Sequence, residues 1–453
     1  MQLPKIKIGQ KPTYVKVAED VDFFALFQKI EPQFETCFVF ESLGEEGKFA
    51  RYSIIGFDPA HIVSARGKTL TYDGKKYVVE NPYYALRDIL PPETIARNYS
   101  GGLIGYLSYE AVNYMESVDV KVHKDFDQFL FGVYLDGLVF DKLTNELFYF
   151  FFDVDRSAML KTILKEPVRS GDLTVKFLRD GMSKEEHEVV VERVKEHIRA
   201  GNTFQCEVGF KSEYEVKGDT LRIYERLREI NPSPFMYYLK FGAKRIIGAS
   251  PELLFSLRDG EMTTRPLAGT IRRGKDEQED QKLARELLSD PKERAEHTML
   301  VDMHRNDIGR VARFGTVRVK DLMTVKRFSH VQHMSSEVTG IIRPGKDMFD
   351  GLASQFPMGT ICGTPKVETM KIIDANEPEA RGPYGGGVGQ FGFNGDCTFA
   401  LTLRSMFVSG EKAYTQTCGG IVYDSEPEKE YEEIRNKSAA MKKTLSVFEK
   451  KDV

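Results

Sequence analysis

TFALTLRSMFV at 398–408 and AYTQTCGGIV at 413–422 are two strand-like runs separated by only four residues, SGEK at 409–412. A connection this short joins antiparallel strands, because a parallel crossover needs a dozen or more residues. A second pair of runs, 253–257 and 261–265, is separated by a connection of similar length. The sequence therefore predicts sheets that are largely antiparallel.

Strand-like and helical segments alternate irregularly along the rest of the chain. The first 155 residues contain apolar runs such as ELFYFFFDV at 146–154, whereas residues 155–182 are polar and weakly patterned. That change is the best candidate for a domain boundary, between a region 1–155 and a domain 180–450. Capping signals and apolar stripes predict helices at 183–201, 219–230, 277–289, 291–305, 347–355, 365–375 and 427–446. Helices mixed with hairpin-linked strands indicate the α+β class.

The composition argues against several classes of protein. With 453 residues, 41% of them hydrophobic, the chain can form two or three units around a sizeable core. A net charge of −4 and the lack of a basic tract argue against binding to nucleic acid. No apolar run reaches the length of a membrane span and no signal peptide is recognisable, so we expect a cytoplasmic protein. The five cysteines are scattered, which disfavours disulfide bonds and a zinc site.

Two acidic pairs, Glu293/Glu296 and Glu430/Glu433, are the most informative chemical signal. The spacing within each pair places both carboxylates on one face of a predicted helix, with Cβ atoms about 5–6 Å apart. Four carboxylates converging from two helices would suit a divalent cation such as Mg²⁺. With a nearby lysine and glycine amides, such a cation would suit a small acidic substrate.

An ordinary structural role is the alternative for each pair. Asp290-Pro291 resembles a helix N-cap followed by proline, which would make Glu293 a capping partner. Glu433 could equally form a surface ion pair with Lys437, one turn further on. Against this, Glu296 and Glu433 share helical stripes with apolar residues. A carboxylate on an apolar stripe is expected to point inward and to need a partner or a metal.

Two other segments present polar groups in defined positions. FPMGTICGTPK at 356–366 runs into a predicted helix with Thr364 as N-cap and Pro365 as the first residue. Such a helix start can bind an anion, although an ordinary cap in a tight turn is the alternative. Gln205 and Glu207 share one face of a predicted strand whose other face is apolar.

His333 and Arg404 are isolated candidates for chemistry. A lone histidine in a strand-like stretch is more often structural, although the pKa of histidine suits proton transfer near neutral pH. Arg404 ends an apolar run, where its guanidinium could hold a carboxylate with two hydrogen bonds. No Ser/His/Asp or Cys/His nucleophile motif is recognisable.

Six ordered motifs in the region 180–450 resemble those of the chorismate-utilising enzyme family. They are PLAGT (266–270), AEH leading to VDMHRND (295–307), VQH (331–333), MGTICGTPK (358–366), RGPYGGGVG (381–389) and CGGIVYDSEPEKEYEEIRNK (418–437). The resemblance implies large, mainly antiparallel sheets that form a sandwich with helices packed outside. It also implies that region 180–450 is the chorismate-binding catalytic domain.

The resemblance implies roles for individual residues. Glu252 matches the general acid that protonates the leaving C4 hydroxyl of chorismate, and His333 matches the histidine associated with proton transfer in pyruvate elimination. The implied Mg²⁺ ligands are Glu296 and Glu433 directly, and Glu293 and Glu430 directly or through water. Positions that match the lining of the substrate site are Thr270, Thr360, Gly363, Tyr384, Arg404, Gly419, Gly420 and Lys437.

Two positions indicate which reaction of the family to expect. Gln205 stands where water-adding members carry a lysine base, so ammonia is favoured as the nucleophile. Ala268 stands where many aminodeoxychorismate synthases carry a nucleophilic lysine, and its absence leaves ammonia to attack C2. The expected reaction is that of the anthranilate synthase branch, which converts chorismate and ammonia to anthranilate and pyruvate for tryptophan biosynthesis. The alternatives are the aminodeoxychorismate synthase branch (4-aminobenzoate) and an inactive, ligand-binding regulatory member.

A regulatory site and a partner are implied as well. Phe40-Glu-Ser42 and NPSPFMYY (231–238) resemble the two elements of the tryptophan feedback pocket in the anthranilate synthase branch, except that Val39-Phe40 replaces two leucines. The implied pocket residues are Glu41, Ser42, Asn231, Pro232, Ser233, Pro234, Met236 and Tyr237. No cysteine lies in a glutaminase-type nucleophile turn, so a separate glutamine amidotransferase subunit is the expected source of ammonia.

Overall fold

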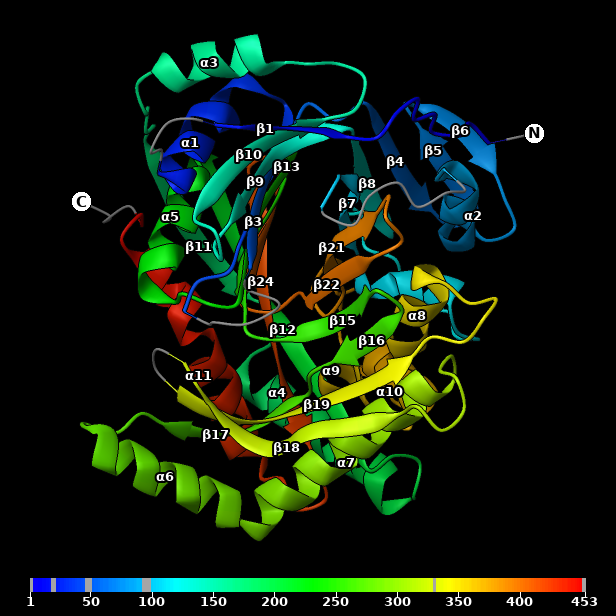
Figure 1. Cartoon of the computed structure of the whole chain (residues 1–453). Coiled ribbons are helices and arrows are strands. Elements are labelled where there is room, and N and C mark those ends of the chain that lie inside the picture. Colours follow the sequence, from blue (N-terminus) through cyan, green and yellow to red (C-terminus); the bar gives the residue numbers. More distant parts are fainter. Residues whose placement is uncertain (1–2, 18–21, 45–50, 92–98, 329–330, 450–453) are drawn as a thin grey trace.

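Two large antiparallel sheets dominate the structure (Figure 1). The computed structural model describes residues 3–17, 22–44, 51–91, 99–328 and 331–449. Each sheet contains 12 of the described strands, and their strand pairs are antiparallel. The predicted α+β class with mainly antiparallel sheets is confirmed.

The first sheet combines strands from both ends of the chain. In spatial order they are β1 (Thr13–Lys16), β10 (Glu146–Phe151), β9 (Asp136–Asp141), β3 (Tyr52–Phe57), β2 (Thr36–Glu41), β13 (Phe235–Phe241), β14 (Lys244–Ser250), β23 (Ser405–Ser409), β24 (Lys412–Ile421), β12 (Gln205–Gly218) and β11 (Leu173–Asp180), with β20 (Gly363–Thr364) paired to β12. The junction between the early and late strands is the β2–β13 pair, in which Phe40 is opposite Tyr237.

The second sheet is mixed in the same way. Its order is β17 (Leu267–Arg272), β19 (Val331–Ile341), β16 (Glu261–Thr264), β15 (Leu253–Arg258), β22 (Cys397–Leu401), β21 (Gly387–Gly392), β7 (Gly102–Leu107), β8 (Phe129–Tyr134), β4 (His61–Arg66), β5 (Thr69–Tyr72) and β6 (Lys75–Val78), with β18 (Arg318–Arg327) paired to β19. Strands from region 1–155 and from domain 180–450 therefore share both sheets.

Helices cover the outer faces of the sheets. Against the first sheet lie α1 (Phe23–Ile30), α3 (Ser157–Lys165), α4 (Lys184–Arg199), α5 (Leu221–Ile230) and α11 (Pro427–Ser446). Near the second sheet lie α2 (Pro82–Ile89), α6 (Glu277–Ser289), α7 (Pro291–Gly309) and α8 (Met348–Gln355). Short elements are η1 (Glu31–Gln33), η2 (Tyr109–Tyr114) and α9 (Gly359–Cys362), and α10 (Lys366–Asn376) packs on β12. None of the described helices is long and apolar enough to span a membrane.

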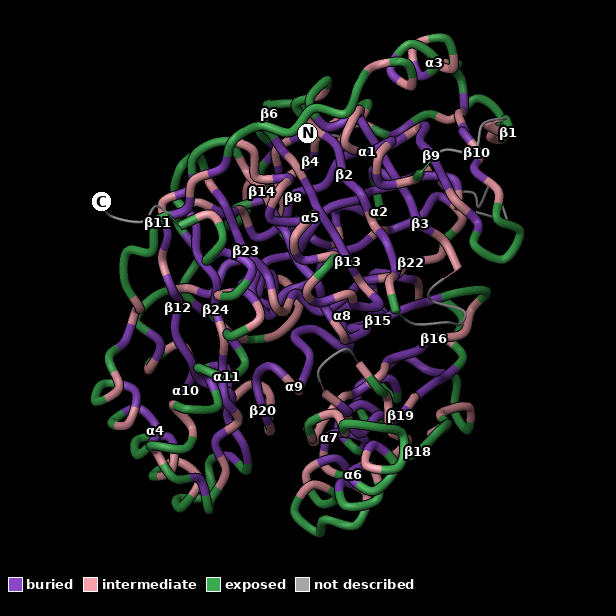
Figure 2. Tube along the Cα trace, turned by 90° about the vertical axis from the view of Figure 1, so that its left-hand side faces the viewer, coloured by how far each residue is buried: buried purple, intermediate pink, exposed green. Residues whose placement is uncertain are grey.

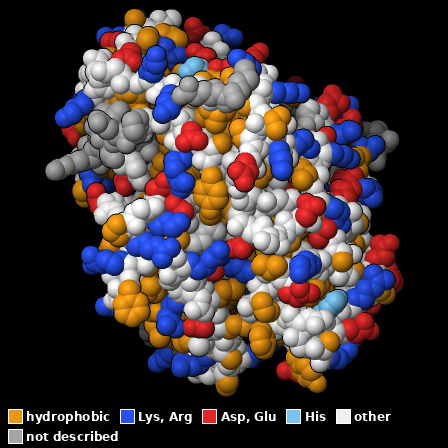
Figure 3. Space-filling view, turned by 90° about the vertical axis from the view of Figure 1, so that its right-hand side faces the viewer, with side chains coloured by type: hydrophobic (Ala, Val, Ile, Leu, Met, Phe, Trp, Pro, Cys, Tyr) orange, Lys and Arg blue, Asp and Glu red, His pale blue; other side chains and the backbone are white. Residues whose placement is uncertain are grey.

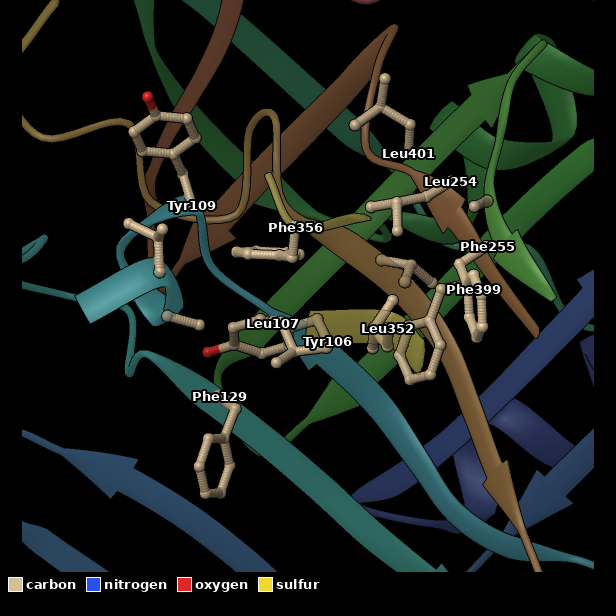
Figure 4. Close-up of a cluster of buried hydrophobic side chains, with 14 of the residues drawn as sticks. Tyr106, Leu107, Tyr109, Phe129, Leu254, Phe255, Leu352, Phe356, Phe399 and Leu401 are labelled. Atoms are coloured by element: carbon tan, nitrogen blue, oxygen red, sulfur yellow. The ribbon is translucent and has the colours of Figure 1, made fainter. Parts of the chain in front are cut away.

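The largest buried cluster fills a layer between the sheets and continues beneath α8 on the outer face of the second sheet. Figure 4 shows part of it, in which Phe399 of β22 lies close to Leu352 of α8. Purple tubes at the centre of Figure 2 mark the same buried layer. Charged side chains of both signs are interspersed on the outer face shown in Figure 3.

Two of the points at which the chain changes sheets lie next to each other. The chain leaves β14 in the first sheet and enters β15 in the second through Glu252, and it returns from β22 to β23 through Arg404. The two crossings are joined by backbone hydrogen bonds, in which Leu401 N donates to Glu252 O (3.1 Å) and Ala249 N donates to Arg404 O (3.3 Å). Arg404 has a φ of 47°, the left-handed region that non-glycine residues rarely adopt.

The return crossing corrects one prediction. Residues 398–408, expected to form one strand, form β22 and β23 in different sheets, so the hairpin with the following run involves only β23 and β24. The other predicted hairpin, β15–β16, is confirmed. The weakly patterned residues 155–182 form α3 and β11, whose few buried side chains give a faint apolar signal.

A buried ion pair fixes the loop after α10 to β12. Arg381 is 2% exposed, and its guanidinium donates to the Glu377 carboxylate (2.7 and 2.9 Å), to Ile361 O (2.7 Å) and to Glu207 O (2.7 Å). It also stacks over the Tyr109 ring, at 4.7 Å. One side chain thus connects η2, α9, α10 and the start of β12.

We expect Arg381→Met to lower the free energy of unfolding by about 3–5 kcal/mol, because it leaves the Glu377 carboxylate buried without its partner. The matched control is Arg179→Met, which removes a 2.6 Å ion pair with Glu213 at a side chain that is 60% exposed. That change should lower the free energy of unfolding far less, because solvent screens an exposed ion pair. Urea denaturation of both variants measures the difference, and equal costs would contradict this role for Arg381.

Candidate active site

The predicted metal-binding residues lie on helices of two arms that extend from the sandwich (Figure 2). One arm contains α6, α7, β18 and β19, and the other contains α4, α10 and α11. One acidic pair, Glu293 and Glu296, lies on α7, and the other, Glu430 and Glu433, lies on α11. The arms meet at β12, where Gln205 Nε2 lies 3.4 Å from Glu296 Oε1.

Glu252 is positioned as a proton donor. It lies at the first sheet crossing, is 4% exposed, and its Oε1 accepts hydrogen bonds from Thr360 Oγ1 (3.0 Å) and Leu267 N (3.3 Å). Burial raises the pKa of Glu252 to about 8, although these hydrogen bonds oppose the rise. The side chain is therefore protonated at neutral pH.

His333 is positioned as a proton acceptor. Its Nδ1 lies 3.0 Å from Gly269 O and 3.0 Å from Thr270 Oγ1. Because a carbonyl oxygen only accepts, Nδ1 carries the proton. Burial, and then the Arg404 charge, lower the pKa of His333 to about 4, so the ring is neutral at pH 7. Nε2 is buried and has no partner among the described residues, which leaves its lone pair free.

The two acidic pairs carry negative charge that the site only partly balances. Burial raises the pKa of Glu293, Glu296 and Glu430, and neighbouring carboxylates add to the rise. Glu430 Oε2 is buried and lacks a hydrogen-bond partner within the described ranges. As placed here, no three His, Cys, Asp or Glu side chains of the described chain form a metal-binding group. The donor set nevertheless fits a divalent cation, whose charge would relieve the repulsion across the two arms.

Glu433 corrects the expectation that its carboxylate is buried. The side chain is 47% exposed and forms an i,i+4 ion pair with Lys437 (2.6 Å), the structural alternative that the spacing had left open. The apolar stripe of α11 packs inward through Ile434 and Met441, and Glu433 lies at the edge of that stripe. Lys437 Nζ also donates to Cys418 O (3.2 Å), which ties the pair to β24.

Glycines bring backbone close to this carboxylate cluster. A Cβ on Gly420 would lie 2.5 Å from Glu207 Oε1 and 2.7 Å from Gln205 Nε2, and one on Gly419 would lie 3.5 Å from Glu430 Oε2. Gly363 has a φ of 111°, and a Cβ there would meet Gln205 O at 2.1 Å. A side chain at Gly363 would displace the β12 backbone, and one at Gly420 would displace the side chains of Glu207 and Gln205.

Tyr384 and Arg404, two of the predicted substrate-lining residues, differ in whether their side chains already have hydrogen-bond partners in the protein. The Tyr384 hydroxyl accepts a hydrogen bond from Cys418 N (3.0 Å) and so supports β24. The Arg404 guanidinium forms no hydrogen bond or ion pair with the described residues, and Glu252 is the charged group that acts on it. Its donors are thus available to an anionic ligand.

The loop before α10 differs from the prediction. Thr364 is not an N-cap, because it pairs with Gln205 in β20 and its carbonyl accepts from Phe204 N (2.9 Å). Pro365 is the N-cap of α10, with an extended ψ of 136°, and no side chain caps that helix start. The expected capping role of Glu293 is also not seen, since Asp290 alone caps α7.

Glu207 is a site residue to which sequence reasoning assigned no role. It is 7% exposed, and burial raises its pKa to about 7, with Lys437 opposing the rise. The available signal was its position on the same face of β12 as Gln205.

A separate cavity of about 260 Å³ lies between the two sheets. Its lining includes the predicted Glu41, Ser42, Pro234, Met236 and Tyr237, and residues of β21 and β22 close the other side. Asn231, Pro232 and Ser233 precede that lining and are not part of it. Ser42 Oγ is buried without a partner in the described chain, whereas the Glu41 carboxylate is bound by Arg228 (2.9 Å) and Tyr224 (2.9 Å).

Comparison with known sequences places this site in a class of enzymes. A family model described as "chorismate binding enzyme" matches residues 35–443. The chain belongs to this family of chorismate-utilising enzymes, and the predicted membership is confirmed.

Individual relatives narrow the resemblance. The chain is 52% identical to "Anthranilate synthase component 1" of Leptospira biflexa, over 98% of both chains. It is 36% identical to "Aminodeoxychorismate synthase component 1" of Bacillus subtilis, over 89% of this chain and 91% of that one. Among solved structures, anthranilate synthase component I from Streptococcus pneumoniae matches with a TM-score of 0.78 and 30% identity, over 94% of this chain and 98% of that one.

The raised pKa of Glu252 predicts that Glu252→Gln stabilises the folded protein by an amount that depends on pH. The folded-state pKa, about 8, lies above the ordinary value of 4.5, so burial costs nothing at low pH. The penalty grows as the pH rises toward 8, because only the unfolded state then loses the proton freely. As the pH rises from 5 to 8, the free energy of unfolding of the variant should increase by about 3 kcal/mol relative to that of the wild type.

Denaturant unfolding at several pH values measures this gain. The exposed Glu428→Gln serves as control, and its difference from the wild type should stay flat between pH 5 and 8, because Lys184 lowers the pKa of Glu428 below its ordinary value of 4.5. A flat difference for Glu252→Gln would show that the carboxyl is ionised in the folded protein.

Proposed function

We propose that the chain is the chorismate-using component of an anthranilate synthase. Relatives that are 52%, 41% and 42% identical carry that name, whereas the aminodeoxychorismate synthase relative is 36% identical. The observation that carries the choice is the site itself, where Gln205 and Ala268 occupy the two positions expected to hold lysine in the other branches. With no lysine at either position, free ammonia is the nucleophile.

The first step exchanges the C4 hydroxyl for an amino group at C2. The nitrogen lone pair forms the C2–N bond, the C1=C2 double bond shifts to C1=C6, the C5=C6 double bond shifts to C4=C5, and the C4–O bond breaks. The nitrogen then releases one proton to solvent. Protonated Glu252 supplies the proton with which the hydroxyl leaves as water. The net change is chorismate plus ammonia to aminodeoxyisochorismate plus water.

The second step eliminates pyruvate. His333 Nε2, neutral and free, removes the proton from C2. Those electrons form C2=C3 and make the ring aromatic as the ether C3–O bond breaks, and the released pyruvate enolate takes up one proton at its methylene carbon to become pyruvate. The Nδ1–H bond to Gly269 O holds the imidazole in the tautomer that this step requires.

Mg²⁺ is the proposed cofactor. Glu296 and Glu433, with Glu293 and Glu430 behind them, would hold the ion between α7 and α11. When bound, the ion would supply positive charge for the ring carboxylate of chorismate. The excess of raised-pKa carboxylates supports this proposal.

A glutamine amidotransferase subunit is the proposed partner. All five cysteines of the chain are buried, so none is placed to act as a glutaminase nucleophile. The relatives' designation as component 1 supports a second component that supplies ammonia.

Incubation of the purified chain with chorismate, ammonium and Mg²⁺ should release anthranilate, which is detected by its fluorescence. Chelation of the metal should abolish the signal, and readdition of Mg²⁺ should restore it. Glu433→Gln should reduce turnover by at least about 100-fold, which is about 2.7 kcal/mol of transition-state stabilisation. Accumulation of 4-amino-4-deoxychorismate instead would favour the aminodeoxychorismate synthase branch.

We also propose that the cavity between the sheets binds tryptophan as a feedback inhibitor. Phe40, Tyr52 and Met236 can contact the indole ring, and the side chains of Arg258 and Asp259 offer charges for its carboxylate and ammonium groups. Tyr237 Oη connects the cavity to the return crossing, because it contacts Ser405 Oγ (2.6 Å) and Leu403 O (3.3 Å) on either side of Arg404.

Ser42→Ala should weaken tryptophan binding about tenfold, because the unpartnered Ser42 Oγ would lose a hydrogen bond to a charged group of the ligand. Calorimetric titration with tryptophan measures the Kd. Ser64→Ala, on β4 outside the cavity lining, is the control and should bind as the wild type does. Unchanged affinity in Ser42→Ala would show that the ligand site lies elsewhere.

A further inference from the structure

Glu207 is a buried carboxylate that the proposed mechanism does not use. It points to the same face of β12 as Gln205, and its backbone is fixed by Arg381 Nη2, which donates to Glu207 O (2.7 Å). In the described part of the chain its side chain has one hydrogen-bond partner, Gln205 Nε2, at the long distance of 3.5 Å. Burying a carboxylate with so few hydrogen bonds costs free energy unless a bound ligand supplies the missing donors.

Gln205 beside it is unsatisfied as well. The side chain is 3% exposed, and its Oε1 has no hydrogen-bond partner among the described residues. Its Nε2 makes only the two long contacts, 3.5 Å to Glu207 and 3.4 Å to Glu296. The amide and the carboxylate both lie over Gly420, where a Cβ would come within 2.7 Å of either. The Glu207 carboxylate and Gln205 Oε1 are therefore two adjacent buried acceptors, and the described residues supply them with no hydrogen bond other than the long contact from Gln205 Nε2 to Glu207.

The available acceptors match one reactant of the proposed reaction. Ammonia has three N–H donors and a single lone pair, so an acceptor-rich pocket can hold its hydrogens and leave the lone pair for carbon. Water offers only two donors and needs donors in return. The nearest cation, Lys437, is engaged by Glu433 (2.6 Å) and by Cys418 O (3.2 Å).

We propose that Glu207 and Gln205 form the binding site for ammonia, with the Glu207 carboxylate and Gln205 Oε1 accepting its N–H bonds. The proposal rests on the proposed function and deepens it, because it names the residues that receive the second substrate. It involves binding alone: no covalent bond to the protein is formed or broken. Glu207 would thus set the affinity for ammonia and leave the affinity for chorismate to other residues.

Steady-state kinetics with ammonium chloride as nitrogen source test this separation. Glu207→Gln preserves the shape of the side chain but replaces an acceptor with an N–H donor. We expect at least a tenfold rise in the KM for ammonia at saturating chorismate, with the KM for chorismate within twofold of the wild type. Glu207→Val, which removes both acceptors, should raise the KM for ammonia further.

Glu213→Gln is the matched control, because Glu213 lies on the same face of β12 but pairs with Arg179 near the surface. It should leave both KM values unchanged. Thermal melts of all variants verify folding. A KM for ammonia within twofold of the wild type, or equal rises in both KM values, would overturn the ammonia site while the function stands. A wild-type chain that makes no anthranilate would refute the proposed function and this inference with it.

Discussion

The rest of the site depends on two backbone hydrogen bonds that join the paired sheet crossings. Leu401 N–Glu252 O and Ala249 N–Arg404 O hold the outgoing and returning chain together where it passes between sheets. A strand that ends in one sheet and resumes in another exposes its backbone at the gap. Here each crossing satisfies the other, and the side chains of Glu252 and Arg404 are fixed beside each other. Arg404 adopts its left-handed backbone, with a φ of 47°, at this hydrogen-bonded crossing.

Burial, more than direct contact, prepares the acid and the base. Glu252 stays protonated because it is removed from water, and His333 stays neutral for the same reason. The same desolvation acts on Glu207 and on the acidic pairs, which lie close enough to repel one another. Without ligands the site therefore holds more carboxylates than its cations balance, a condition suited to a metal ion and to a basic reactant.

The sequence predicted the existence of most elements more reliably than the path of the chain. Helices α6 and α11 begin and end where capping and apolar stripes place them. The change of sheet within residues 398–408 was missed, because a strand has the same alternation in either sheet. Thr364 was misplaced as a cap because pairing to Gln205, a residue 159 positions away, is a tertiary contact. Glu207 had no predicted role because a glutamate on the polar face of a strand is equally typical of a solvent-exposed face and of a polar binding site.

The order of strands in the first sheet has a consequence for how the protein is made. Its centre is β14, β23 and β24, with early strands on one side and β12 and β11 on the other. The two flanks cannot be joined until residue 421, the end of β24, has left the ribosome. Long-range pairing of this kind folds slowly, since loop closure precedes the stabilising contacts. Nascent chains will therefore carry open sheet edges through most of synthesis, and they depend on protection from aggregation until the last tenth of the chain arrives.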